Sequence, residues 1–216
     1  DAIAAGLQAL MVWGMRVGVE FAELFEDRQL SNDCKAAEKK LVKAASKVYK
    51  KFLASCPAPD APGSKQVTAL MTITGLIDAP KADKEFLSIN GAQGFSTFYG
   101  YYMLEAMAMA GNYQGALDVI REYWGAMIDL GATSFWEDFD INWIPNAAPI
   151  DELVPEGKKD IHGDCGAYCY VGFRHSLCHG WASGPTSWLS RHILGVEVIE
   201  PGCRQVRITP HLGDLQ

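Results

Sequence analysis

The spacing of hydrophobic residues along the first part of the chain predicts two amphipathic helices. Apolar residues recur at helical intervals over roughly residues 2–26, and after a break at residues 27–30 the pattern resumes over about residues 33–54. Ser31 or Asn32 would cap the second helix. One face of this helix is apolar and the opposite face is rich in lysine, which we interpret as a solvated outer face.

Further helices and two strands are predicted downstream. The helices are expected over about residues 64–73, 97–110, 114–130 and 183–194. Ser64 would cap the first of them, Pro80 would end that region, and Gly131 fits the C-terminal cap of the third. After Gly195 the pattern changes to alternating β-branched residues over 196–199 and 206–208, which is typical of strands.

This order of elements predicts an all-α fold followed by the start of a β domain. Paired helices with long loops at one end suit a helical toroid or array better than a four-helix bundle. We expect residues 1–195 to form the helical domain and residues 196–216 the first strands of the β domain. Between residues 131 and 173 no clear period appears, and loops of that length in a compact protein are usually functional.

Composition narrows the class of protein. The 216 residues are 49% hydrophobic and 21% charged, as in an ordinary globular protein, and the net charge of −7 argues against a nucleic-acid partner. No run of about 18 uncharged apolar residues occurs, so we expect no membrane insertion. The chain opens on Asp1 inside a helical pattern, which suggests a piece of a longer polypeptide. The six cysteines are irregularly spaced, and we interpret them as free buried thiols.

The strongest candidate for chemistry follows the helix that ends near Gly131. Three carboxylates lie there among aromatic rings: Glu137, Asp138 and Asp140 with Phe135, Trp136 and Phe139. Sugar hydrolysis needs a carboxyl group whose pKa is tuned by desolvation, and aromatic rings stack on the apolar face of a sugar. An acidic loop with buried aromatics also occurs in many proteins, so these residues alone are consistent with either a catalytic site or an ordinary structural loop.

A second cluster surrounds His179 and Trp181, which could line a polar pocket beside flexible glycines, although a lone histidine is more often a satisfied core residue. Six potential metal ligands fall within a short span: His162, Cys165, Cys169, His175, Cys178 and His179. Their spacing does not match the usual zinc sites, so we expect no metal and no cofactor.

Several motifs together resemble the bacterial α-L-rhamnosidases of glycoside hydrolase family 78. They are Gly131-Ala-Thr-Ser-Phe-Trp-Glu137, Ser176-Leu-Cys-His179-Gly-Trp181, Gly184-Pro-Thr-Ser-Trp-Leu189 and the upstream Gly94-Phe-Ser-Thr-Phe-Tyr-Gly100. The resemblance implies an (α/α)6 barrel followed by a β-sandwich, of which this chain would hold the later helices and the first strands. It also implies removal of terminal α-L-rhamnose from glycans with inversion, by two carboxyl groups acting from opposite faces of the sugar.

The resemblance further implies roles for individual residues. Glu137 would be the general base, while Trp136, His179 and Trp181 would contact the sugar. The general acid of the family precedes the first helix, so this chain alone would be catalytically incomplete and would depend on the N-terminal remainder of its polypeptide. Asp138, Asp140 and Asp164 are candidates to replace that general acid, but none of them lies at the position that the family uses.

Family analogy suggests a periplasmic or secreted enzyme. Three alternatives stay open: a toroid glycosidase for another sugar, a noncatalytic carbohydrate-binding relative, and a purely structural helical array.

Overall fold

The chain is mostly helical. The computed structural model describes residues 2–55, 58–59, 61, 63–161, 163–165 and 176–215. Helix makes up 58% of the structure and strand 7%, in agreement with the expected all-α class. The chain divides into two compact units, residues 1–89 and 90–216. The boundary expected after residue 195 lies inside the second unit.

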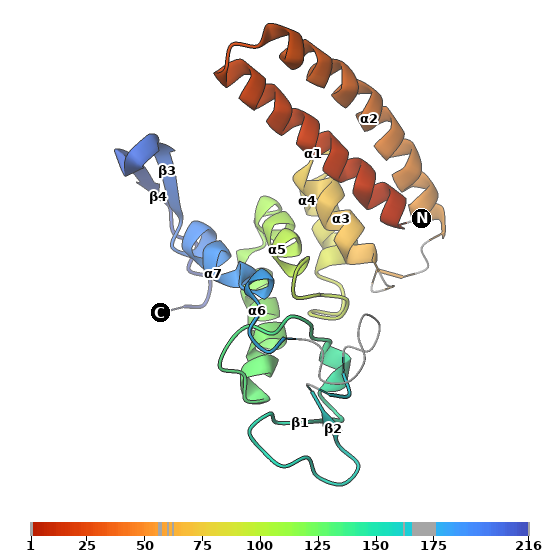
Figure 1. Ribbon diagram of the computed structural model, residues 1–216, viewed down its shortest axis with the longest axis vertical. Coiled ribbons are helices and arrows are strands. Elements are labelled where there is room, and N and C mark those ends of the chain that lie inside the picture. Colours follow the sequence, from red (N-terminus) through yellow and green to blue (C-terminus); the bar gives the residue numbers. More distant parts are fainter. Residues whose placement is uncertain are drawn as a thin grey trace. The chain divides into compact units, whose positions relative to one another are not determined.

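The first unit begins with a long helical hairpin, drawn in red and orange in Figure 1, formed by α1 (Ala2–Leu24) and α2 (Arg28–Ser55). Asp27 starts α2, because its carboxylate accepts a hydrogen bond from the backbone N–H of Leu30 at 2.9 Å. The prediction of a cap at Ser31 or Asn32 is therefore wrong. The helix begins a turn earlier, and Ser31 is buried within it.

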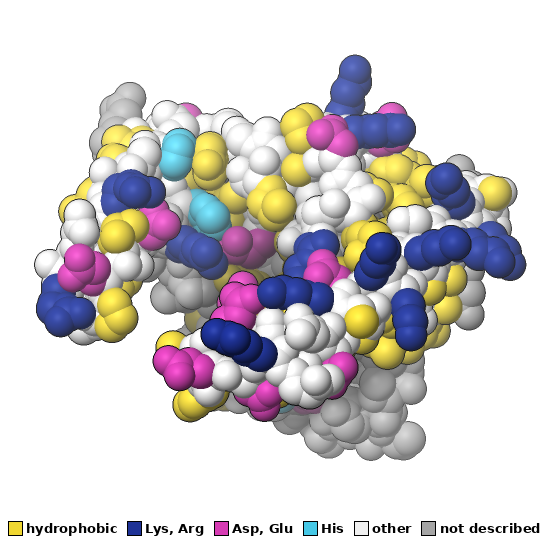
Figure 2. All heavy atoms as spheres, turned by 90° about the horizontal axis from the view of Figure 1, so that it is seen from above, with side chains coloured by type: hydrophobic (Ala, Val, Ile, Leu, Met, Phe, Trp, Pro, Cys, Tyr) yellow, Lys and Arg dark blue, Asp and Glu magenta, His cyan; other side chains and the backbone are white. Residues whose placement is uncertain are grey.

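Small residues, not large ones, line the packed face of α1. Ala5 and Ala9 are fully buried, whereas Leu7, Phe21 and Leu24 are 56%, 57% and 73% exposed. Small side chains let the helices approach closely, and a Cβ added at Gly18 would lie only 2.9 Å from Sγ of Cys34. Figure 2 shows hydrophobic side chains exposed beside charged ones on the face that it draws.

Of the described residues, α1 is the one helix long and apolar enough to cross a membrane, judged by length and composition alone. A core helix of a soluble protein passes the same test, so the expectation of no membrane insertion stays a prediction.

Three short elements complete the first unit: α3 (Ser64–Ile73), α4 (Ala79–Ala82) and the π-helical turn η1 (Asp83–Leu87). The N-cap of α3 is Gly63, at φ +83°, while the hydroxyl of Ser64 donates to the carbonyl of Ala58. Pro80 lies in the first turn of α4 instead of ending the region, since proline is tolerated there and Asp78 caps the helix. The predictions for Ser64 and Pro80 are thus wrong.

The second unit is built on α5 (Gly100–Met109) and α6 (Tyr113–Asp129), which match the predicted helices closely. The helix predicted over residues 183–194 is divided into α7 (Gly184–Trp188) and the π-helical η4 (Leu189–Ile193).

Two glycines allow close packing among these helices. A Cβ at Gly100 would lie 2.6 Å from the ring of Trp124 on α6, and one at Gly184 would lie 2.7 Å from Cβ of Tyr101 on α5. Gly131, at φ +89°, ends α6 as predicted, and the N–H of Ala132 bonds the carbonyl of Met127 at 2.9 Å.

The strands are short. The two predicted strands are β3 (Val196–Glu200) and β4 (Gln205–Ile208), which pair antiparallel as a hairpin turned by η5 (Pro201–Cys203), and all of their residues are exposed. The long irregular region holds the two-residue strands β1 (Ala147–Ala148) and β2 (Lys159–Asp160), which pair in parallel. It also holds the 3-10 turn η2 (Ile141–Trp143), and a second such turn, η3 (Gly180–Ala182), precedes α7.

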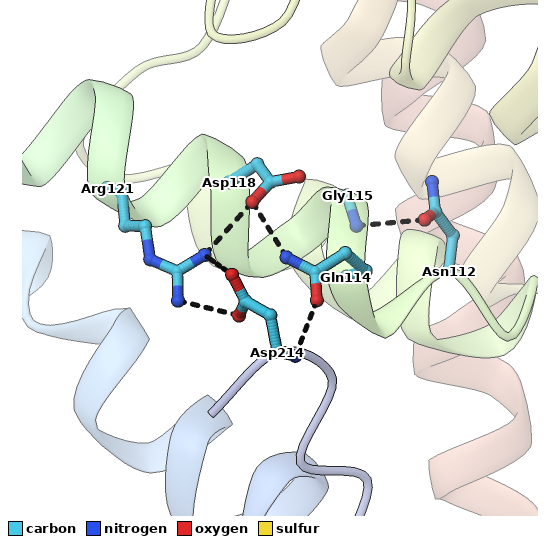
Figure 3. A network of polar contacts seen from close by, with 6 residues as sticks. All are labelled: Asn112, Gln114, Gly115, Asp118, Arg121 and Asp214. Atoms are coloured by element: carbon cyan, nitrogen blue, oxygen red, sulfur yellow. Dashed lines mark hydrogen bonds and ion pairs between the residues drawn. The ribbon is translucent and has the colours of Figure 1, made fainter. Parts of the chain in front are cut away.

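The segment after β4 returns to α6 through a polar network (Figure 3). The guanidinium of Arg121 bonds both carboxylate oxygens of Asp214, at 2.7 and 3.1 Å, and also Asp118 at 3.0 Å. The side chain of Gln114 bridges the carboxylate of Asp118 and the backbone N–H of Asp214. These contacts join the C-terminal segment to the outer face of α6.

Candidate active site

Glu137 lies on an irregular segment that is hydrogen-bonded to the segment around Ser176. The N–H of Glu137 donates to the carbonyl of Ser176 at 2.8 Å, and the N–H of His179 donates to the carbonyl of Phe135 at 2.7 Å. The N–H of Ser176 in turn donates to Oε2 of Glu137 at 2.7 Å. The backbone of one segment therefore orients the carboxylate of the other. A carboxylate offers about four lone-pair positions, and the N–H of Ser176 occupies one of them.

The carbonyl oxygen of Glu137 joins two further elements to the site. It accepts hydrogen bonds from the hydroxyl of Thr97 and from the indole N–H of Trp181, both at 2.6 Å. Thr97 lies directly before α5, and Trp181 lies in η3. Residues separated by at least 40 positions in the sequence thus meet at one backbone atom.

The segment around Glu137 is buried together with two aromatic rings. Glu137 is 8% exposed, while Trp136 and Phe139 are 0% and 2% exposed, and their ring centroids lie 5.9 Å apart. The hydroxyl of Tyr123 donates to the carbonyl of Phe139. Trp136, expected at the sugar, therefore lies in the core next to Glu137. Its indole N–H has no hydrogen-bond partner within the described residues.

The rings of His179 and Trp181 lie against each other on the segment that follows Ser176. Their ring centroids lie 4.3 Å apart, and Trp181 is 44% exposed. Nδ1 of His179 accepts a hydrogen bond from the backbone N–H of Trp181 at 3.3 Å. A neutral imidazole that accepts at Nδ1 carries its proton on Nε2, so the ring is able to donate a hydrogen bond to a ligand.

Two of the three other candidate carboxylates accept hydrogen bonds from nearby backbone N–H groups. Oδ1 of Asp140 accepts from the N–H of Asn142 at 2.8 Å and so caps η2. Oδ2 of Asp164 accepts from the N–H of Asp160 at 2.9 Å. Asp138 is half-buried beside Glu137.

The cysteines differ from the expectation of buried thiols. Of the four in the described part of the chain, Cys34 and Cys165 are buried, but Cys178 and Cys203 are exposed, so the prediction is wrong for the latter two. Burial raises the pKa of the Cys165 thiol.

The potential metal ligands are only partly described. His162, Cys169 and His175 lie outside the described residues, as does Cys56. Within the residues that are described, no three His, Cys, Asp or Glu side chains are placed to hold a metal ion.

Sequence reasoning singled out Glu137, Trp181 and His179 but gave no role to Thr97 or Ser176. Both lie in the quoted motifs, which is the only signal that could have drawn attention to them. Thr97 bonds the backbone carbonyl of Glu137, 40 positions away, and Ser176 bonds the Glu137 carboxylate, 39 positions away, through its own backbone N–H. Since each bond uses a backbone atom, the types of the side chains alone do not reveal these contacts.

No protein-family model matches the chain, and a search of the curated proteins found no match. The resemblance to α-L-rhamnosidases therefore rests on the motifs alone.

Proposed function

We propose that the protein is a glycoside hydrolase that removes terminal α-L-rhamnose from glycans with inversion of configuration, and that Glu137 is its general base. One observation carries the proposal: a buried carboxylate is oriented by the backbone of Ser176, on a segment that also carries the partly exposed His179 and Trp181. Trp181 offers an apolar face and His179 a polar one, the two kinds of surface that a deoxy sugar needs.

In this mechanism Glu137 accepts the proton of a water molecule as the water attacks the anomeric carbon. A carboxylic acid on the other side of the ring gives its proton to the leaving oxygen. The two groups stand about 6.5–9.5 Å apart in inverting enzymes, which leaves room for the water. The bond from Ser176 fixes the direction in which Glu137 accepts, and an oriented base is effective because no reorganisation is needed during the reaction.

The proposal includes the architecture that the motifs imply. The helices would belong to an (α/α)6 barrel, and the β3–β4 hairpin would open a β-sandwich. The general acid would come from the polypeptide before α1, and a periplasmic or secreted location would suit an enzyme that degrades glycans.

Replacing Glu137 with Gln tests the role of the base. Gln can still accept the N–H of Ser176 but cannot take a proton, so turnover should fall by roughly 10²–10⁴. Sugar binding should stay within about tenfold, since the side-chain volume is unchanged. The measurement is release of p-nitrophenol from its α-L-rhamnoside by the full-length polypeptide, with binding followed by calorimetry. The exposed Glu152→Gln is the matched control and should behave as wild type.

Three other outcomes would contradict the proposal in different ways. Full activity in Glu137→Gln would remove Glu137 as the base. Activity on other aryl glycosides only would replace rhamnose with a different sugar. Rhamnose binding without turnover in wild type would identify a carbohydrate-binding protein that performs no chemistry.

A further inference from the structure

A cavity of about 460 Å³ lies within the first unit, between α2 and the segment that follows α3. This volume is typical of sites for small organic molecules. One face of α2 lines the cavity, where Tyr49, Lys50 and Leu53 recur at helical spacing, and α4 and η1 contribute Lys81 and Phe86. Every residue that lines the cavity belongs to the first unit.

The lining of this cavity is mainly apolar. Met71 and Ala82 are buried, at 0% and 3% exposure, whereas Leu53 is 40% exposed and Phe86 is partly exposed. The buried side chains are held in place by packing, and the exposed ones leave apolar area that a ligand can cover. The cavity therefore favours a ligand with a hydrocarbon body.

The charged residues at the cavity are unequally satisfied. Lys50 and Lys81 are exposed, and their ammonium groups have no ion-pair or hydrogen-bond partner among the residues that the structure describes. The carboxylate of Asp78 caps α4, because it accepts the backbone N–H of Lys81 at 3.0 Å. Glu85 is the other acidic residue in the lining. Two unpaired ammonium groups are thus opposed by the carboxylate of Glu85.

The helix that carries Lys50 adds to this excess of positive charge. Lys47 and Lys51 are exposed on α2 within one turn of Lys50. Clustered charges of one sign raise the local concentration of ions of the opposite sign. A lysine ammonium acts as a point charge, so it accommodates a carboxylate without one fixed geometry. An anion is therefore favoured over a cation of the same shape.

We propose that this cavity is a binding site for a small organic carboxylate, whose hydrocarbon body occupies the apolar lining while its carboxylate lies between Lys50 and Lys81. A neutral molecule gains only the apolar contacts, and a cation is repelled by the excess positive charge. The site is independent of the hydrolysis proposed for Glu137, because none of its residues lies in the second unit.

Cinnamate is a suitable probe, because it joins a phenyl ring to a carboxylate, and cinnamyl alcohol has the same carbon skeleton without the charge. Calorimetry with the full-length polypeptide should show saturable binding of cinnamate, tighter than that of the alcohol. Lys50→Gln combined with Lys81→Gln should weaken cinnamate binding roughly three- to twentyfold, the range of two partly exposed ion pairs. The same double variant should leave the affinity for the alcohol unchanged.

A matched control separates the cavity from the net charge of the protein. Lys39→Gln combined with Lys40→Gln removes the same two charges from α2 outside the cavity. About 15 Å of helix separates Lys40 from Lys50, and salt screens exposed charges over that distance. The control should therefore bind cinnamate like wild type.

Leu53→Ala tests the apolar contact. It should weaken both probes roughly three- to tenfold, since both use the same hydrocarbon body. Leu30→Ala is its control, because Leu30 lies on the same helix outside the cavity and is 48% exposed, against 40% for Leu53. Both probes should keep their wild-type affinity for Leu30→Ala.

Three results would overturn the proposal. The first is cinnamate that does not saturate or binds no tighter than the alcohol. The second is an equal loss in the two double lysine variants, which would assign the attraction to net charge. The third is tighter binding of cinnamylamine than of cinnamate, which would make the cavity a site for cations at Glu85.

Discussion

Thr97 provides the sharpest test of how the site is held. Its hydroxyl is buried, at 3% exposure, and donates to the carbonyl of Glu137 at 2.6 Å. Thr97→Val removes this donor and keeps the shape of the side chain. The carbonyl retains its bond from Trp181, so the loss should lie near the usual net value of one hydrogen bond, about 1 kcal/mol. For a chain of this size that corresponds to a fall in Tm of roughly 2–4 °C.

Thr72 offers a matched control. It is fully buried in α3, and its hydroxyl donates to the carbonyl of Thr68 at 2.7 Å, so Thr72→Val removes a similar bond away from Glu137. Both variants should lose similar stability in thermal unfolding followed by circular dichroism. Only Thr97→Val should also lower kcat, by about tenfold, because a small displacement of a catalytic group is costly while Trp181 limits the movement. Equal kcat in the two variants would refute the reasoning that the carbonyl positions the carboxylate.

Two further predictions concern packing and charge in the second unit. Gly100→Ala places a methyl 2.6 Å from the buried ring of Trp124 and should lower the free energy of unfolding by roughly 1–3 kcal/mol. Gly125→Ala meets nothing within 4 Å and should raise the free energy of unfolding by about 0.5–1 kcal/mol. Urea unfolding measures both changes, and equal effects would contradict the close packing at Gly100. The hydrogen bond from Arg121 lowers the pKa of the Asp214 carboxyl, so this carboxylate stabilises the fold above its ordinary pKa of about 3.9 and the contribution is lost as the pH falls through the lowered value. Asp214→Asn should therefore lower Tm slightly at pH 7, and the difference from wild type should shrink as the pH falls into the acid range; a difference that does not change with pH would disprove the ion pair.

The sequence predicts the helices well because their signal is local. The limits of α5 and α6 and the Gly131 cap follow from spacing and backbone preference within a few residues. The packed face of α1 does not follow from the same signal. Apolar residues occur on more than one side of that helix, and the choice of the small-residue side depends on the close approach at Gly18, which is a property of the folded hairpin.

The candidate site shows the same division between local and long-range information. Residue types identify Glu137 and Trp181, since a carboxylate and an aromatic ring carry recognisable chemistry. The orientation of the carboxylate is set by the backbone N–H of Ser176, which every residue except proline would supply. No pattern of side chains encodes that contact, so only the fold reveals it.

The carbonyl oxygen of Glu137 determines which substitutions can separate catalysis from sugar binding. Trp181 packs against the rings of His179 and Phe98 and donates to that oxygen, so its removal would disturb catalysis and ligand binding together. Phe98 contacts the ring of Trp181, and its own side chain makes no hydrogen bond to the carbonyl. A change at Phe98 therefore acts first on the neighbouring ring surface.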